Sequence, residues 1–103
     1  MTESVKIAVD AMGGDNSPRK IIEGILHNHN ILNKNNFYKI FGDRDKIFNL
    51  INNKIDKKFY EIIHTVDKVE STDTPLEAAK RGKKTSMWLA IESVKKEETD
   101  IVI

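Results

Sequence analysis

The 103-residue sequence lacks cysteine, long apolar runs and an excess of either charge. Without cysteine it has no disulfides, thiolate nucleophile or cysteine-ligated metal, as is typical of the reducing cytosol. No segment approaches the roughly 18 apolar residues of a membrane span. The apolar stretch at residues 5–9 is too short for a signal peptide, and Lys6 interrupts it. Seventeen Lys and Arg against sixteen Asp and Glu give a net charge of +1, which argues against a nucleic-acid partner. We expect a cytoplasmic protein.

The sequence does contain alternating apolar runs and amphipathic stretches. Four short runs predict buried strands, at residues 4–10, 37–41, 59–65 and 100–103. Strands that alternate with amphipathic helices indicate an α/β fold with a parallel sheet covered on both faces. Ligands of such sheets bind beyond the carboxyl ends of the strands. Because the last strand has no polar tail, we interpret residues 1–103 as the front portion of a larger domain.

Capping signals predict where the helices begin. Ser17 is the predicted N-cap of the first helix, with Pro18 in its first turn, and the Asn-rich residues 28–36 end it. Asp43 is the predicted N-cap of the second helix, and a capping box with Pro75 starts a short helix at residues 76–81. The faces predicted to pack on the sheet are Ile21, Ile22, Ile25, Leu26 and His29 in the first helix, Ile47, Phe48, Leu50, Ile51 and Ile55 in the second, and Met87, Ala90, Ile91 and Val94 in the last.

Two adjacent glycines, Gly13 and Gly14, join the first strand to the first helix. Glycine lets the backbone approach a ligand closely, and a helix N-terminus attracts anions, most often phosphate. On this interpretation Gly13, Gly14 and Asn16 bind phosphate. The alternative is a plain tight turn with Asp15 and Asn16 as turn formers. The loop matches neither a dinucleotide fingerprint nor a nucleotide-binding P-loop.

Two carboxylates flank this loop. Asp10 and Asp15 are candidate catalytic groups, and Asp10 at the end of its strand would orient a donor or act as a base. The alternative for Asp10 is that it accepts hydrogen bonds from the loop's own N–H groups. A carboxylate beside a phosphate repels it, so a phosphate site here needs basic neighbours.

The stretch before the last helix supplies such neighbours. Arg81, Lys83 and Lys84 are candidate cations, and the hydroxyls of Thr85 and Ser86 follow them at the helix start. Charged side chains, hydroxyls and N–H groups together form an oxyanion site. The alternative is a solvated basic turn on the surface.

The remaining polar residues give weaker signals. His27 and His29 are two residues apart, so they do not share a helix face, and we predict solvent-exposed or edge positions. His64 is a bystander or a general base. Trp88 lies off the apolar stripe and covers the helix edge or meets a partner. No group has the spacing of a metal site, and we expect no metal.

Four motifs occur in a specific order along the chain. They are Asp10-x-Met12-Gly13-Gly14-Asp15 followed by Pro18, then Phe41-Gly42-Asp43, Asp73-x-Pro75, and Arg81-x-Lys83 leading to Ser86-Met87. In this order they resemble the N-terminal part of the bacterial phosphate acyltransferase of phospholipid synthesis, over essentially the whole chain. Two departures stand out. Thr85 occupies the position where the family usually has the first of two serines, and the chain ends at Ile103, where the family continues into a Ser-Ala-Gly-Asn-Thr-Gly loop.

The resemblance implies a Rossmann-like three-layer α/β/α sandwich with a mostly parallel sheet, here truncated. It thus makes residues 1–103 the N-terminal part of a single α/β/α catalytic domain. It implies transfer of a fatty acyl group from acyl carrier protein to inorganic phosphate, giving acyl phosphate without a cofactor. For the full-length enzyme it implies a homodimer and peripheral contact with the inner face of the membrane, whereas we expect the 103-residue chain alone to be inactive. The alternatives are a phosphate acetyltransferase-like or dehydrogenase-like relative, and a non-catalytic phosphate-binding fragment.

Overall fold

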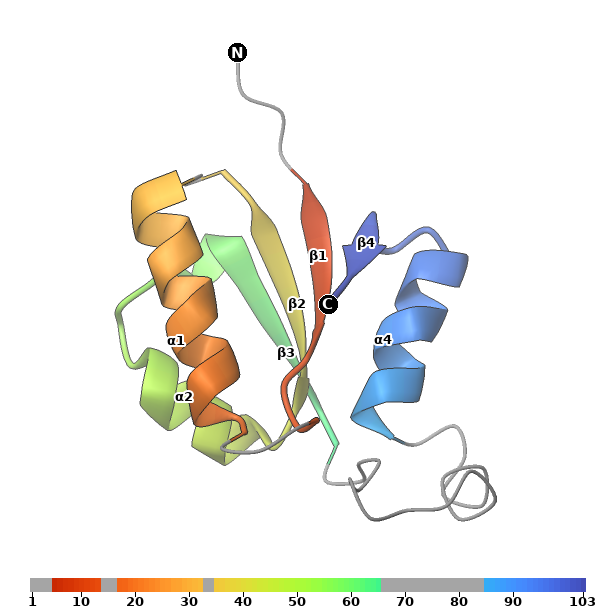
Figure 1. Cartoon of the computed structure of the whole chain (residues 1–103), viewed down its shortest axis with the longest axis horizontal. Helices are drawn as coiled ribbons and strands as arrows, with labels where there is room; N and C mark the ends of the chain where they lie inside the picture. Colours follow the sequence, from red (N-terminus) through yellow and green to blue (C-terminus); the bar gives the residue numbers. More distant parts are fainter. Residues whose placement is uncertain (1–4, 14–16, 33–34, 66–84) are drawn as a thin grey trace.

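The computed structural model describes residues 5–13, 17–32, 35–65 and 85–103. Within them, four parallel strands form one sheet in the order β3-β2-β1-β4, with helices on both faces (Figure 1). The elements are β1 (Lys6–Asp10), α1 (Arg19–His27), η1, a π-helical turn (Asn28–Leu32), β2 (Phe37–Gly42), α2 (Arg44–Ile51), η2, a 3-10 turn (Lys57–Phe59), β3 (Tyr60–His64), α4 (Ser86–Lys95) and β4 (Ile101–Val102). The predicted α/β sandwich and all four predicted strands are confirmed.

The chain winds in two directions from β1. It first builds β2 and β3 on one side of β1, with α1 and α2 on one face of the sheet. It then returns through α4, on the opposite face, and adds β4 on the other side of β1 (Figure 1). The winding therefore reverses between β1 and β4, and the carboxyl ends of these strands are where such sheets bind ligands.

The face that carries α1 and α2 holds the larger apolar core. Side chains alternate between the two faces of a strand, and on this face most of them are isoleucines. Its buried members are Ile7, Val9, Ala11, Ile22, Ile25, Tyr38, Ile40, Ile47, Ile51 and Ile55. Burial of these branched side chains holds the two helices to the sheet.

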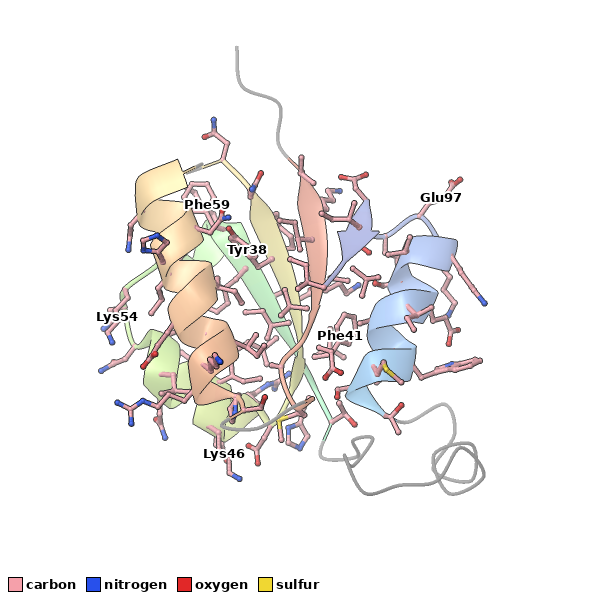
Figure 2. All side chains as sticks on the ribbon, in the orientation of Figure 1. Tyr38, Phe41, Lys46, Lys54, Phe59 and Glu97 are labelled. Carbon is pink, nitrogen blue, oxygen red and sulfur yellow. The ribbon has the colours of Figure 1, made fainter. Side chains whose placement is uncertain are left out.

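The face that carries α4 holds a smaller apolar cluster. Its buried apolar residues are Ala8 of β1, Phe41 of β2 and Ala90 of α4. Figure 2 shows Tyr38 on the side of α1 and Phe41, from the same strand, on the side of α4. Lys39 also belongs to this face by alternation, and its Nζ lies 3.0 Å from Glu98 Oε1.

The start and end of the first helix differ from prediction. Ser17 does not cap it, because α1 begins at Arg19 after Pro18 and has no side-chain cap. The Ser17 hydroxyl donates instead to the carbonyl oxygen of Gly13. At the other end α1 stops at His27, but the chain continues helically through η1. His29 within η1 is buried against the Phe59 ring, which agrees with its place on the predicted apolar stripe and shows that the exposed or edge position also predicted for it is wrong.

The second helix follows prediction at its cap and on most of its face. The Asp43 carboxylate accepts hydrogen bonds from the N–H groups of Asp45 and Lys46, which confirms it as the N-cap. Ile47 and Ile51 are buried. Phe48 is 45% exposed, so its predicted packing on the sheet is wrong.

The buried face of α4 is also different from the predicted one. Met87 and Ile91 are exposed on its outer side, where Trp88 also lies. Ser86, Ala90 and Ser93 are the buried residues. Ala90 is thus the only fully buried member of the predicted stripe. The helix predicted at residues 76–81 lies outside the described residues. Within the part of the chain that the structure covers, no helix combines the length and apolarity of a membrane crossing.

Candidate functional site

The loop that follows β1 folds back onto the last residue of that strand. Asp10 Oδ1 accepts hydrogen bonds from the backbone N–H groups of Met12, at 3.0 Å, and Gly13, at 3.2 Å. The Ala11 N–H donates to the carbonyl of Phe41 at 3.0 Å, which extends the ladder with β2. Asp10 therefore meets the loop's own donors, which is the alternative that the sequence left open for this residue.

The N-terminus of α4 reaches the same carboxylate from the far end of the chain. Thr85 is the N-cap, and its hydroxyl accepts a hydrogen bond from the Trp88 N–H at 3.2 Å. The next residue, Ser86, donates its hydroxyl to Asp10 Oδ1 at 2.5 Å across 76 positions of sequence. Thr85 and Ser86 are 2% and 1% exposed. Two segments from opposite ends of the chain thus share one acceptor oxygen.

Gly13 is needed because the Asp10 carboxylate lies so close to it. A Cβ placed at Gly13 would lie 2.8 Å from Asp10 Oδ2, a distance that Cβ atoms essentially never show. The other oxygen of this carboxylate is held by three donors, so it has little freedom to move away. The first glycine of the loop thus serves a close approach within the protein.

Met12 ties the loop to the end of β2. Its sulfur lies 3.4 Å from the Asp43 backbone nitrogen, which donates to it. A Cβ at Gly42 would lie 2.9 Å from Met12 Cγ and 2.8 Å from Ile47 Cδ1. Gly42 therefore leaves room for Met12, and the Asp10–Gly13 and Phe41–Asp43 motifs are parts of one packed junction. Before the structure, Met12 had no geometric role beyond its place in the motif.

His64 marks the neighbouring strand end of the same edge. Its Nδ1 accepts a hydrogen bond from the Arg44 N–H at 3.1 Å, and its side chain is exposed. By alternation along β3 it lies with Ile62 and Tyr60 on the side of α1 and α2. Asp10 points to the opposite face, toward α4, so His64 does not converge with it.

The structure therefore brings together four of the predicted site residues. Asp10, Gly13, Thr85 and Ser86 meet where β1 ends and α4 begins. The remaining predicted site residues lie outside the described residues, namely Gly14, Asp15, Asn16, Arg81, Lys83 and Lys84. In the described ranges, no three His, Asp or Glu side chains are grouped as a metal ion would need.

These features define a class of protein. It is a doubly wound parallel α/β protein, with a glycine loop and a helix N-terminus joined at the carboxyl edge where the winding reverses. The described N–H groups of Met12 and Gly13 donate to Asp10, and that of Trp88 donates to the Thr85 hydroxyl.

Sequence comparison gives the family. Residues 5–103 match the model of the family described as "Fatty acid synthesis protein", and the chain belongs to this family. It is 63% identical over 103 residues to a phosphate acyltransferase of Pelagibacter ubique, covering 100% of this chain and 30% of that protein. Similar proteins named phosphate acyltransferase occur in Listeria welshimeri, at 44% identity over 96% of this chain and 28% of theirs, and in Enterococcus faecalis, at 41% over 95% and 28%. The chain thus spans less than a third of the length of these relatives.

Proposed function

We propose that this chain is the N-terminal part of a phosphate acyltransferase that moves a fatty acyl group from acyl carrier protein to inorganic phosphate. The observation that carries the proposal is the match of nearly all of this chain to part of relatives of that name. It is supported by the place of the glycine loop and the start of α4, which meet at the carboxyl edge of the sheet where the winding reverses and such sheets bind ligands.

The reaction asks for positioning and electrostatics. A phosphate oxygen attacks the thioester carbonyl carbon, and the carbonyl oxygen becomes an oxyanion. The carbon–sulfur bond then breaks, the carrier thiolate leaves and takes up a proton, and acyl phosphate remains. The protein must hold the phosphate in line and aim donors at the oxyanion. No cofactor enters this balance.

The proposed binding residues come from the two sides of the junction. Gly14 and Asn16 continue the loop beyond Gly13, and Arg81 and Lys83 precede α4 in the sequence. Cations near the phosphate would offset the negative charge of Asp10 and of Asp15, the second proposed catalytic carboxylate.

The start of α4 forms the other side of the proposed site. The first N–H groups of a helix have no partner within it, and Thr85 caps this end. With Gly13 and Ser86, this residue completes the set proposed to hold phosphate or acyl phosphate.

A chimaera tests the proposal. The matching 103 residues of the Pelagibacter ubique relative are replaced by this chain, and acyl carrier protein thioester is supplied with and without phosphate. We expect phosphate-dependent loss of thioester, with acyl phosphate trapped by hydroxylamine as the hydroxamate. The 103-residue chain alone is expected to be inactive. Thioester loss without phosphate would indicate a thioesterase, and an inactive but folded chimaera would contradict the proposal.

A glycine pair gives the matched control. Gly14→Val in the chimaera is expected to abolish phosphate-dependent turnover, because a β-branched side chain blocks close approach to the loop. Gly24→Val makes the same change on the exposed side of α1, where an added Cβ meets nothing within 4 Å. Equal activity of the two variants would show that the loop is only a turn. Homodimer formation and peripheral membrane contact belong to the same proposal, and size measurement and liposome flotation of the chimaera test them.

A further inference from the structure

One carboxylate oxygen joins the two sides of the candidate site. Asp10 Oδ1 accepts from Met12 and Gly13 in the loop and from Ser86 at the start of α4. Hydrogen bonds to an ionised acceptor are the strong ones. Hence the loop and the helix are both attached to the end of β1, an inner strand of the sheet.

The proton count at Ser86 limits what this residue can do. A serine hydroxyl has one proton to donate, and that of Ser86 goes to Asp10 at 2.5 Å. The side chain is 1% exposed and lies under the start of the helix. With this contact in place, Ser86 has no hydroxyl proton left for a phosphate.

The same contact limits Asp10. A general base must face the proton that it removes. Three protein donors already converge on Oδ1, and Oδ2 faces Gly13, where even a Cβ would be too close. Nothing in this reaction requires a strong base, because phosphate is already an anionic nucleophile at neutral pH.

We infer that Asp10 is a positioning residue that fixes the glycine loop and the N-terminus of α4 relative to each other, and that Ser86 acts on the phosphate through Asp10. The inference rests on the proposed function. It replaces the direct roles first assigned to these residues, a catalytic carboxylate and a phosphate ligand, with a role in positioning the two elements.

Two substitutions of Asp10 separate these roles. Asp10→Asn keeps an oxygen acceptor for the three donors but removes the charge and the basicity, whereas Asp10→Ala removes the acceptor. In the chimaera we expect Asn to stay within about tenfold of the parent kcat/KM. Ala is expected to lose on the order of 100-fold, the scale of a misplaced reacting group, with a raised KM for phosphate. If Asn is as inactive as Ala, Asp10 acts as a charge or a base and the inference is wrong.

A double variant tests the role of Ser86. If Ser86 acts only through Asp10, Ser86→Ala combined with Asp10→Ala loses no more activity than Asp10→Ala alone. Losses that multiply would show that Ser86 contacts the substrate itself. Ser93→Ala is the matched control, because Ser93 is buried on the same helix and bonds only within that end of the molecule, to Ala90 and Thr99. It is expected to leave KM for phosphate unchanged.

The outcomes keep the inference and the proposed function apart. An active parent chimaera with equally damaged Asn and Ala variants overturns the inference alone. An inactive, folded parent chimaera overturns the proposed function. Thermal unfolding of the 103-residue chain then still tests the contact between Asp10 and Ser86. The double variant Asp10→Ala with Ser86→Ala should lose less Tm than the sum of the losses of the two single variants. Additive losses would overturn it.

Discussion

The two faces of the sheet differ in the size and number of their buried apolar side chains. The face under α1 and α2 is filled with branched side chains such as Ile22, Ile40 and Ile47. The face under α4 has a smaller buried cluster, Ala8, Phe41 and Ala90, with buried serines on the helix. Large side chains bury more apolar area, whereas small ones let a helix lie close to the strands.

This difference explains where the candidate site lies. With Ala8 of β1 and Ala90 of α4 in the cluster between them, α4 packs against the sheet closely enough for the Ser86 hydroxyl to reach the carboxylate of Asp10. The larger core on the other face holds the sheet itself together. Stability and site geometry are therefore carried by opposite faces of one sheet.

The largest expected effect on stability comes from a cavity in the larger core, under α1 and α2. Ile47 is fully buried, and its Cδ1 lies beneath Gly42. Ile47→Ala should cost about 2–5 kcal/mol of unfolding free energy, from lost burial and the cavity left behind. Val94→Ala, at a half-buried position on the α4 face, should cost about 1 kcal/mol. Urea denaturation of the chain measures both, and equal losses would remove the distinction between the faces.

A pH titration probes the same core through its one buried phenol. Burial raises the pKa of Tyr38 above 10.0, and a hydrogen bond with Asn36 offsets part of this. Burial favours the neutral phenol of Tyr38 in the folded state. The stabilisation that this phenol gives the folded state is therefore complete below pH 10 and is lost as the pH rises through the pKa of Tyr38 in the folded protein. We expect Tyr38→Phe to weaken this alkaline loss.

The control for this titration is Tyr60→Phe, on the neighbouring strand. At neutral pH, Tyr38→Phe should cost about 1 kcal/mol, because the hydroxyl donates to Asn28 Oδ1 at 3.0 Å. Urea midpoints measured from pH 7 to pH 11 would reveal both effects. An alkaline loss that is unchanged in Tyr38→Phe would show that other groups cause it.

The smallest effect lies outside both cores. Gly24 is in the middle of α1, exposed, and an added Cβ would meet nothing. Gly24→Ala should raise the unfolding free energy by roughly 0.5–1 kcal/mol, because it restricts the unfolded chain and favours the helix. A thermal melt measures it, and a loss of stability would show that α1 packs differently on its outer side.

Local signals in the sequence predicted the elements well. The apolar run at 37–41 became β2. Asp43 caps α2 because a short acidic side chain before a helix accepts hydrogen bonds from the first free N–H groups of that helix. Each of these signals acts over a few residues, so it can be read from the sequence. The alternation of predicted strands and helices then predicted the parallel sheet. Ser17 had the same signature as Asp43, but its hydroxyl found the Gly13 carbonyl instead.

Tertiary contacts decided what the pattern could not. Counting apolar residues placed Met87 and Ile91 against the sheet, yet both are exposed. The buried positions include Ser93, whose hydroxyl is satisfied by the Ala90 carbonyl at 2.6 Å, so a small polar residue can be buried there. The contact between Asp10 and Ser86 spans 76 positions and leaves no local signal.

The most direct test of the division between the faces is the KM for phosphate of two chimaera variants. One enlarges a buried side chain on the α4 face, and the other shortens a buried side chain on the opposite face. Ala90→Val overfills the α4 face and should shift α4 away from β1. Ile47→Val thins the larger core and should cost about 0.5–1.5 kcal/mol of stability. Under conditions where both variants are folded, we predict that Ala90→Val raises KM for phosphate at least about tenfold and that Ile47→Val leaves it unchanged. Equal KM values for the two variants would contradict the claim that the α4 face positions the site.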